Sequence, residues 1–124
     1  MVVLTEAEKR ELCRSLAEHL PTLRSLLGVT QTELGWLCGF SRIRVSQIET
    51  GKSEMSWSQL TSILLVCLLN IKTKEYLCRN EILAPDFWQF MQRIDGNIPP
   101  SVNVTVREEI LPTSFFEPSD GKRT

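Results

Sequence analysis

The spacing of helix-capping residues in the first 60 positions constrains the fold more than any other feature. In a capping box, a Ser or Thr at the N-cap is followed three residues later by Glu or Gln, and each side chain accepts a hydrogen bond from the backbone N–H of the other residue. Three such pairs are present: Thr5 with Glu8, Thr30 with Glu33, and Ser56 with Gln59. Glycines, which suit the left-handed conformation at a helix end, stand between these boxes at positions 28, 39 and 51. The pattern predicts an all-α chain built from short helices and tight turns.

Two consecutive helices are expected in residues 5–27. The first would bury one leucine face, formed by Leu12, Leu16 and Leu20. Pro21 lacks the N–H that a helix interior needs, but it suits the first turn of a new helix. Residues 21–27 are therefore predicted to form a separate short helix that ends at Gly28.

Residues 30–51 have the spacing of a helix-turn-helix motif, in which two helices of about eight residues are joined by a turn containing Gly39. The inward residues of the first helix would be Leu34, Leu37 and Cys38. Ser41 would cap the second helix, and Val45 and Ile48 would anchor it to the first. The outward residues of this second helix and its C-terminal end would be Arg42, Ile43, Arg44, Ser46, Gln47 and Thr50. Arg and Gln form bidentate hydrogen bonds with guanine and adenine edges, and Ile can contact a thymine methyl, so this face suits base reading in a major groove.

The segment after residue 56 is predicted to contain three more helices. Helix 57–70 is apolar around nearly its whole circumference and must be covered on two sides, by the preceding helices and by the C-terminal part or a second subunit. Helix 72–83 would follow, and another helix would begin at Pro85. The apolar stripe of this last helix is interpreted as core or dimer interface, and it consists of Phe87, Phe90, Met91 and Ile94, beside Trp88.

The chain after Gly96 has no helical period. Alternating valines predict a short strand over residues 102–106 within a largely extended tail. We therefore expect a DNA-binding domain in residues 1–71, a helical extension in 72–95 and an extended tail in 96–124.

Composition and charge exclude several classes of protein. The 124 residues include 42% hydrophobic and 23% charged residues, which excludes a wholly disordered chain. The net charge of −1 excludes a globally basic nucleic-acid coat but not a local patch, and residues 42–52 hold three basic side chains against one acidic. The longest apolar run, residues 63–69, is much shorter than the roughly 18 residues of a membrane span. No secretory signal is recognisable. We therefore expect a soluble, cytoplasmic protein.

No catalytic or metal-binding constellation is recognisable. The four cysteines, at positions 13, 38, 67 and 78, lack zinc-type spacing and are expected to be buried free thiols. His19 is the only histidine, and no nucleophile or carboxylate partner for it can be identified. We expect neither enzyme activity nor a cofactor or metal.

The run from Thr30 to Lys52 resembles the DNA-binding core of the XRE family, the helix-turn-helix proteins similar to phage repressor and Cro. The best-matching parts are the TQxEL opening at residues 30–34 and the IExGK close at residues 48–52. The resemblance spans about residues 21–70. It implies a lambda-repressor-like domain of about five helices that binds a specific DNA sequence.

The resemblance also implies individual roles. Gln31 would contact phosphate and brace the recognition helix, and Ser41, at that helix's N-cap, would be a further DNA-binding residue. Arg42 and Ile43 would contact bases, Gln47 would contact a further base, and Arg44 and Ser46 would contact bases or phosphates. Thr50 and Lys52 would contact backbone phosphates. Gly35 departs from the usual Ala; we expect it to cost roughly 1 kcal/mol of helix propensity without blocking packing.

The sequence thus predicts a transcriptional regulator that reads double-stranded DNA with helix 41–51. We expect it to act as a homodimer on a palindromic site, paired through residues 76–94, with segment 98–111 as a candidate to cross to the partner. An alternative function is that of an antitoxin or another protein-interaction module, whose tail binds a protein partner through a strand at residues 102–106.

Overall fold

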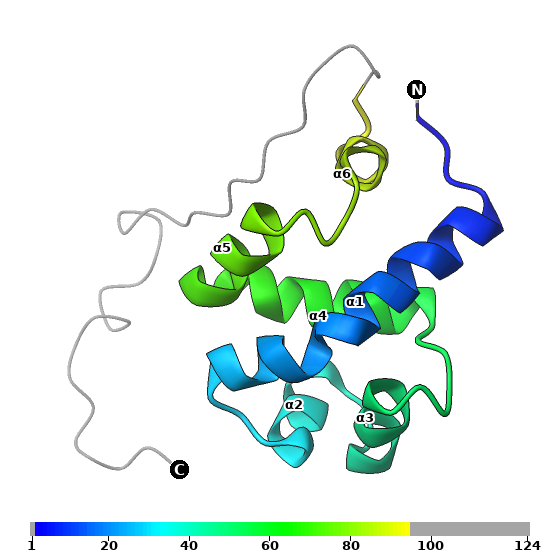
Figure 1. Ribbon diagram of the computed structural model, residues 1–124. Coiled ribbons are helices and arrows are strands. Elements are labelled where there is room, and N and C mark those ends of the chain that lie inside the picture. The colour runs from blue at the N-terminus through cyan, green and yellow to red at the C-terminus, as the bar shows by residue number, and fades with distance from the viewer. Residues whose placement is uncertain (1, 95–124) are drawn as a thin grey trace.

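The computed structural model describes residues 2–94, which form an all-α fold (Figure 1). Its six helices are α1 (Glu6–Leu27), α2 (Gln31–Cys38), α3 (Arg42–Glu49), α4 (Trp57–Leu69), α5 (Ile71–Arg79) and α6 (Pro85–Gln92). The predicted all-α class is confirmed. The predicted tail at 96–124, its strand at 102–106 and the crossing segment 98–111 lie outside the described residues.

Helix α1 is a single helix of 22 residues, so the predicted break at Pro21 is wrong. Its buried side chains continue across the proline with helical spacing, and they are Leu12, Cys13, Leu16, Leu20 and Leu23. Pro21 is exposed and cannot donate to the carbonyl of Ala17, a defect that costs roughly 3 kcal/mol in a helix interior. Burial of Leu20 and Leu23 on either side of Pro21 offsets this cost. Four helices, rather than about five, therefore precede residue 71.

The predicted caps are confirmed. Each of the three capping boxes makes both of its hydrogen bonds, and Ser41 Oγ accepts from the backbone N–H of Arg44 at 3.1 Å. Gly28 and Gly39 end their helices with φ of 73° and 87°. Helix α3 ends at Glu49, and the turn after it passes through Gly51 with φ of 76°.

Helices α1 and α4 cross in the middle of the molecule, with α2 and α3 on one side and α5 and α6 on the other (Figure 1). Helix α4 packs against α1, α2 and α5, and α3 packs against α2 and α1. One hydrophobic core joins these helices, and its fully buried side chains include Leu16, Leu23, Leu34, Val45, Leu60, Ile63 and Phe87.

The predicted two-sided cover of α4 is incomplete within the described chain. Leu60, Ile63, Leu64 and Cys67 are buried against neighbouring helices, as expected. Leu65 and Leu69 lie on the opposite face and are 59% and 65% exposed, and Ile71 at the start of α5 is 59% exposed.

Helix α5 ends at Arg79, four residues before the predicted end. Asn80 caps it by donating from Nδ2 to the carbonyl of Tyr76 at 2.9 Å, and Glu81 then turns the chain away with φ of 48°. Ile82 and Leu83 are buried from the loop, where Ser15 Oγ of α1 donates to the Ile82 carbonyl at 2.8 Å. Ile82 and Leu83, which led to the prediction of a longer helix, are therefore buried from a turn instead.

Candidate nucleic-acid interface

The turn between α2 and α3 is tight, and α2 has a glycine, Gly35, where its backbone comes closest to the turn. The backbone N–H groups of Gly39 and Phe40 both donate to the carbonyl of Gly35, at 2.8 and 3.0 Å. A Cβ on Gly35 would lie 2.3 Å from the carbonyl oxygen of Phe40, far inside contact distance. The expectation that Gly35 is merely a costly substitute for Ala is therefore wrong, since this turn requires a glycine here.

Helix α3 is anchored by few apolar side chains. Val45 and Ile48 are buried at 0% and 2% exposure, which confirms their predicted role. The helix has eight residues, so these two anchors define only a narrow inward edge. Polar contacts at its two ends supply the remaining constraints.

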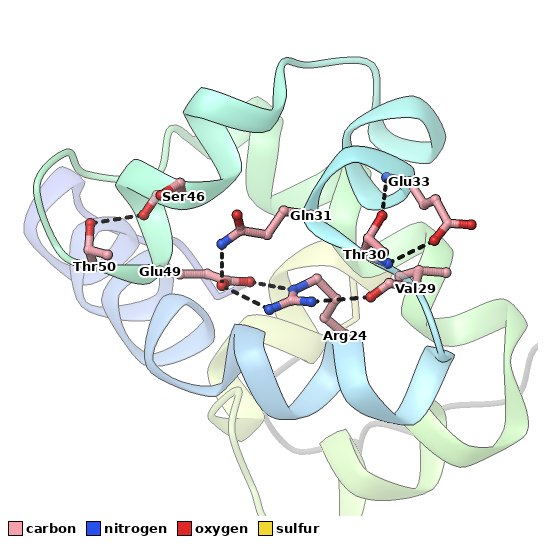
Figure 2. Close-up of polar contacts among 8 residues, drawn as sticks. All are labelled: Arg24, Val29, Thr30, Gln31, Glu33, Ser46, Glu49 and Thr50. Atoms are coloured by element: carbon pink, nitrogen blue, oxygen red, sulfur yellow. Dashed lines mark hydrogen bonds and ion pairs between the residues drawn. The ribbon is translucent and has the colours of Figure 1, made fainter.

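Glu49 fixes the C-terminal end of α3 to α1 and α2 (Figure 2). Its carboxylate is 7% exposed and accepts from Arg24 Nε at 2.9 Å and from Arg24 Nη2 at 3.3 Å. The Gln31 amide Nε2 also donates to it, at 3.0 Å. Arg24 Nη1 further donates to the carbonyl of Val29 at 3.2 Å, which holds the loop before α2.

This cluster shows Gln31 bracing α3, while its phosphate contact stays a prediction. Sequence reasoning did not find Arg24 as a member of the motif. The only local signal is that Arg24 is the basic residue in the last turn of α1. Its partner Glu49 is 25 positions away, and no local pattern connects the two.

Arg44 holds the N-terminal end of α3 against the start of α4. Its guanidinium donates to Gln59 Oε1, at 2.9 Å from Nη2 and 3.3 Å from Nε, and also to Ser53 Oγ and the carbonyl of Glu54. Arg44 is half-buried rather than directed outward. The outward placement expected from the sequence is therefore wrong, whereas a contact with DNA stays a prediction.

The exposed side chains of the motif include Arg42, Ile43 and Lys52. Ile43 is 64% exposed. Within residues 2–94, neither Arg42 nor Lys52 forms a salt bridge. Both cations are therefore available to an anionic partner.

The other predicted contact residues differ in exposure. Ser41 and Thr50 are exposed, while Ser46 and Gln47 are half-buried. Thr50 Oγ1 donates to the carbonyl of Ser46 at 2.9 Å, so this hydroxyl also closes the end of α3 (Figure 2). Ser41 Oγ accepts from the backbone at the start of α3 and can still donate its own proton.

Helix α2 exposes two large apolar side chains that the sequence did not place at the surface. Trp36 is 76% exposed and Leu37 is 56% exposed. The inward placement expected for Leu37 is wrong, because Leu34 and Gly35 are the residues that α2 buries.

The cysteines agree only in part with the expectation of buried thiols. Burial raises the pKa of Cys38 to about 11 and that of Cys67 to about 12, and it also raises the pKa of Cys13. These three thiols are therefore protonated and unreactive at neutral pH. Cys78 is exposed on α5, which contradicts the expectation. All four cysteines are free.

His19 has a structural environment. Its Nδ1 lies 3.0 Å from Tyr76 Oη, and the two rings meet edge to face at 5.8 Å between centroids, joining α1 to α5. The described part of the chain contains no group of three or more His, Cys, Asp or Glu residues that could hold a metal ion. Among the helices of residues 2–94, none is long and apolar enough to span a bilayer.

Comparison with known proteins gives one finding. Residues 15–69 match a protein-family model described as a helix-turn-helix domain. The match begins within α1 and ends with α4, so it includes α2, the turn, α3 and the Arg24–Glu49 ion pair. No curated protein and no solved structure matches the chain significantly.

Proposed function

We propose, from the premise that residues 15–69 are a helix-turn-helix domain, that this chain is a transcriptional regulator that binds a specific sequence of double-stranded DNA. The observation that carries the proposal is the form of α3. Its inner edge is anchored by Val45 and Ile48, and Arg42 and Ile43 are exposed at the end that would enter a major groove. We propose a cytoplasmic location and no catalytic activity, since helix-turn-helix domains are ordinarily binding modules.

The proposed contacts divide into base reading and phosphate binding. Arg42 would donate to a guanine edge, Ile43 would contact a thymine methyl, and Gln47 would contact a further base. The phosphate contacts are assigned to Gln31, Ser41, Ser46, Thr50 and Lys52. Because the whole chain carries a net charge of −1, affinity depends on this local set of donors and cations.

A homodimer on a palindromic site is the arrangement we propose. One recognition helix covers only a few base pairs, and paired half-sites of this class lie roughly 34 Å apart, on one face of the duplex. The sequence predicted pairing through residues 76–94. Four large apolar side chains there are used inside the chain itself, since Leu77, Ile82, Leu83 and Phe87 are at most 5% exposed.

The junction of α4 and α5 offers a more apolar surface for pairing. Leu65, Leu69 and Ile71 are each more than half exposed, whereas Met91 of the 76–94 segment is 41% exposed. Exposed apolar patches of this kind mark interaction sites. We therefore extend the proposed dimer contact to this junction.

Selection of bound sequences from a random DNA pool tests the proposed function. A palindromic consensus is expected, and failure to enrich any sequence would overturn the proposal. Sedimentation at micromolar concentration tests the dimer. The double variant Leu65→Ser, Leu69→Ser should shift the protein from dimer to monomer. Val3→Ser is the matched control, because Val3 is 74% exposed but lies in the N-terminal segment.

A further inference from the structure

The side chain of Arg44 makes more polar contacts than any other in the proposed interface. A guanidinium has five N–H donors in a fixed planar fork. In this structure its three nitrogens make four contacts, with Gln59 Oε1, Ser53 Oγ and the carbonyl of Glu54. Few donors remain for a phosphate or a base.

Gln59 gives this contact its rigidity. It occupies the N3 position of the α4 capping box, and its Oε1 also accepts from the backbone N–H of Ser56 at 3.0 Å. Arg44 lies in the first turn of α3, where its own backbone N–H is bound by Ser41 Oγ. The first turn of α3 is therefore tied directly to the first turn of α4.

The loop between these two turns carries Lys52. Its path is fixed from the α3 side by the backbone N–H of Ser53, which donates to the Gln47 carbonyl at 3.2 Å. Arg44 fixes the same loop by its contacts with Ser53 and Glu54. Lys52 itself is exposed and lies next to the two anchored points.

We propose that Arg44 is a positioning residue of the DNA interface: it fixes the α3–α4 loop, and with it Lys52, relative to the exposed edge of α3, and it does not bind DNA itself. This inference rests on the proposed function. It assigns Arg44 a different role from that implied by the family resemblance. Polar contacts then fix both ends of α3, those of Arg44 at its N-terminal end and those of Glu49 at its C-terminal end.

Arg44→Lys distinguishes positioning from direct contact. Lysine keeps the charge and would preserve much of a phosphate contact, but its single ammonium cannot satisfy three acceptors arranged around a planar fork. We expect affinity for the selected DNA to fall by about tenfold, comparable with loss of one phosphate or base contact. Arg14→Lys is the matched control, because Arg14 is exposed on α1, where it pairs with Glu11 of the same helix, and it should leave affinity unchanged.

A double-mutant cycle shows whether Arg44 acts through Lys52. In a Lys52→Ala background, Arg44→Lys should reduce affinity by less than about threefold, because the lysine that it positions is already gone. If the double variant loses affinity by the product of the two single fold-changes, the proposal is overturned. An unchanged affinity of the Arg44→Lys single variant would also overturn it.

Hydrogen exchange of the free protein tests the clamp without DNA. In Arg44→Lys, the Ser53 amide should exchange about tenfold faster, while the Leu34 amide in α2 should keep its protection. Equal exchange of Ser53 in both proteins would overturn the proposal, and loss of protection at both amides would show a folding defect that overturns the specific role. This result stands even if no DNA is selected, in which case the proposed function alone fails.

Discussion

Helices α3 and α6 both have eight residues, but they are held in the molecule by different means. Helix α3 buries two aliphatic side chains and is fixed by polar contacts of Arg44 and Glu49 at its ends. Helix α6 has no side-chain cap and is held by aromatic packing instead. Phe87 is fully buried and meets Trp57 and Trp88 edge to face, with centroid distances of 5.9 and 5.1 Å.

The difference follows from what each helix leaves free. In the proposed function α3 enters a DNA groove and must keep most of its circumference exposed, so only a narrow edge is available for apolar burial. Directional hydrogen bonds can fix its orientation without widening that edge. Helix α6 can instead bury a wide aromatic face. Lys9 of α1 adds to this face, because its ammonium lies 5.2 Å from the Trp57 ring and 5.7 Å from the Phe90 ring.

The largest expected effect is on the aromatic side of this comparison. Phe87→Ala should lower the free energy of unfolding by roughly 3–5 kcal/mol, because it removes a buried ring and leaves a cavity. Urea denaturation measures this loss. Met91→Ala, at a position that is 41% exposed on the same helix, is the control and should lose much less. A loss below about 1 kcal/mol for Phe87→Ala would show that packing does not hold α6.

Gly35→Ala should be the next most damaging change. A new methyl group at 2.3 Å from the Phe40 carbonyl oxygen forces the α2–α3 turn apart, and overpacking of this kind costs about 3 kcal/mol. Thermal unfolding measures the loss. Gly39→Ala is the matched control, because nothing lies within 4 Å of its added Cβ and only its φ of 87° is unfavourable, a strain of roughly 1–2 kcal/mol. If Gly35→Ala instead stabilises the protein, helix propensity outweighs the close approach.

Arg42→Ala tests the exposed side of α3 directly. Loss of a bidentate base contact should remove about 1–3 kcal/mol of discrimination at one base pair in each half-site. Non-specific binding should change little, and binding assays on selected and random DNA measure the difference. An equal loss on both kinds of DNA would assign Arg42 to a phosphate.

The smallest effect concerns acid stability of the caps. The backbone N–H and hydroxyl of Thr30 hold the pKa of Glu33 below its ordinary value of 4.5, and Thr5 does the same for Glu8. A carboxylate whose folded pKa is lowered contributes stability above the unfolded pKa and loses it as pH falls through the folded pKa. The melting temperature of the wild type should therefore exceed that of Glu33→Gln at pH 7, and the difference should shrink below the ordinary pKa. Glu8→Gln should behave in the same way, and a pH-independent difference would contradict this explanation.

Local patterns in the sequence determined where most helices begin and which edge of α3 faces the core. A capping box closes its hydrogen bonds within three residues, so Thr5, Thr30 and Ser56 identify helix starts without knowledge of the rest of the fold. The spacing of Val45 and Ile48 likewise identifies the inner edge of α3. Arg42 and Lys52 are exposed, as the predicted interface requires.

Tertiary structure decided the features that depend on distant partners. Helix α1 continues through Pro21 because Leu20 and Leu23 are both buried in the core. The free energy of that burial depends on the other helices and cannot be derived from the local sequence. Arg44 faces Gln59 rather than solvent because α4 begins beside α3 in space, and Arg24 joins the motif because α1 passes next to Glu49. Hydrogen bonds between residues close in sequence can be read from the chain, whereas burial and polar pairing across 15 or 25 positions exist only after the helices have packed.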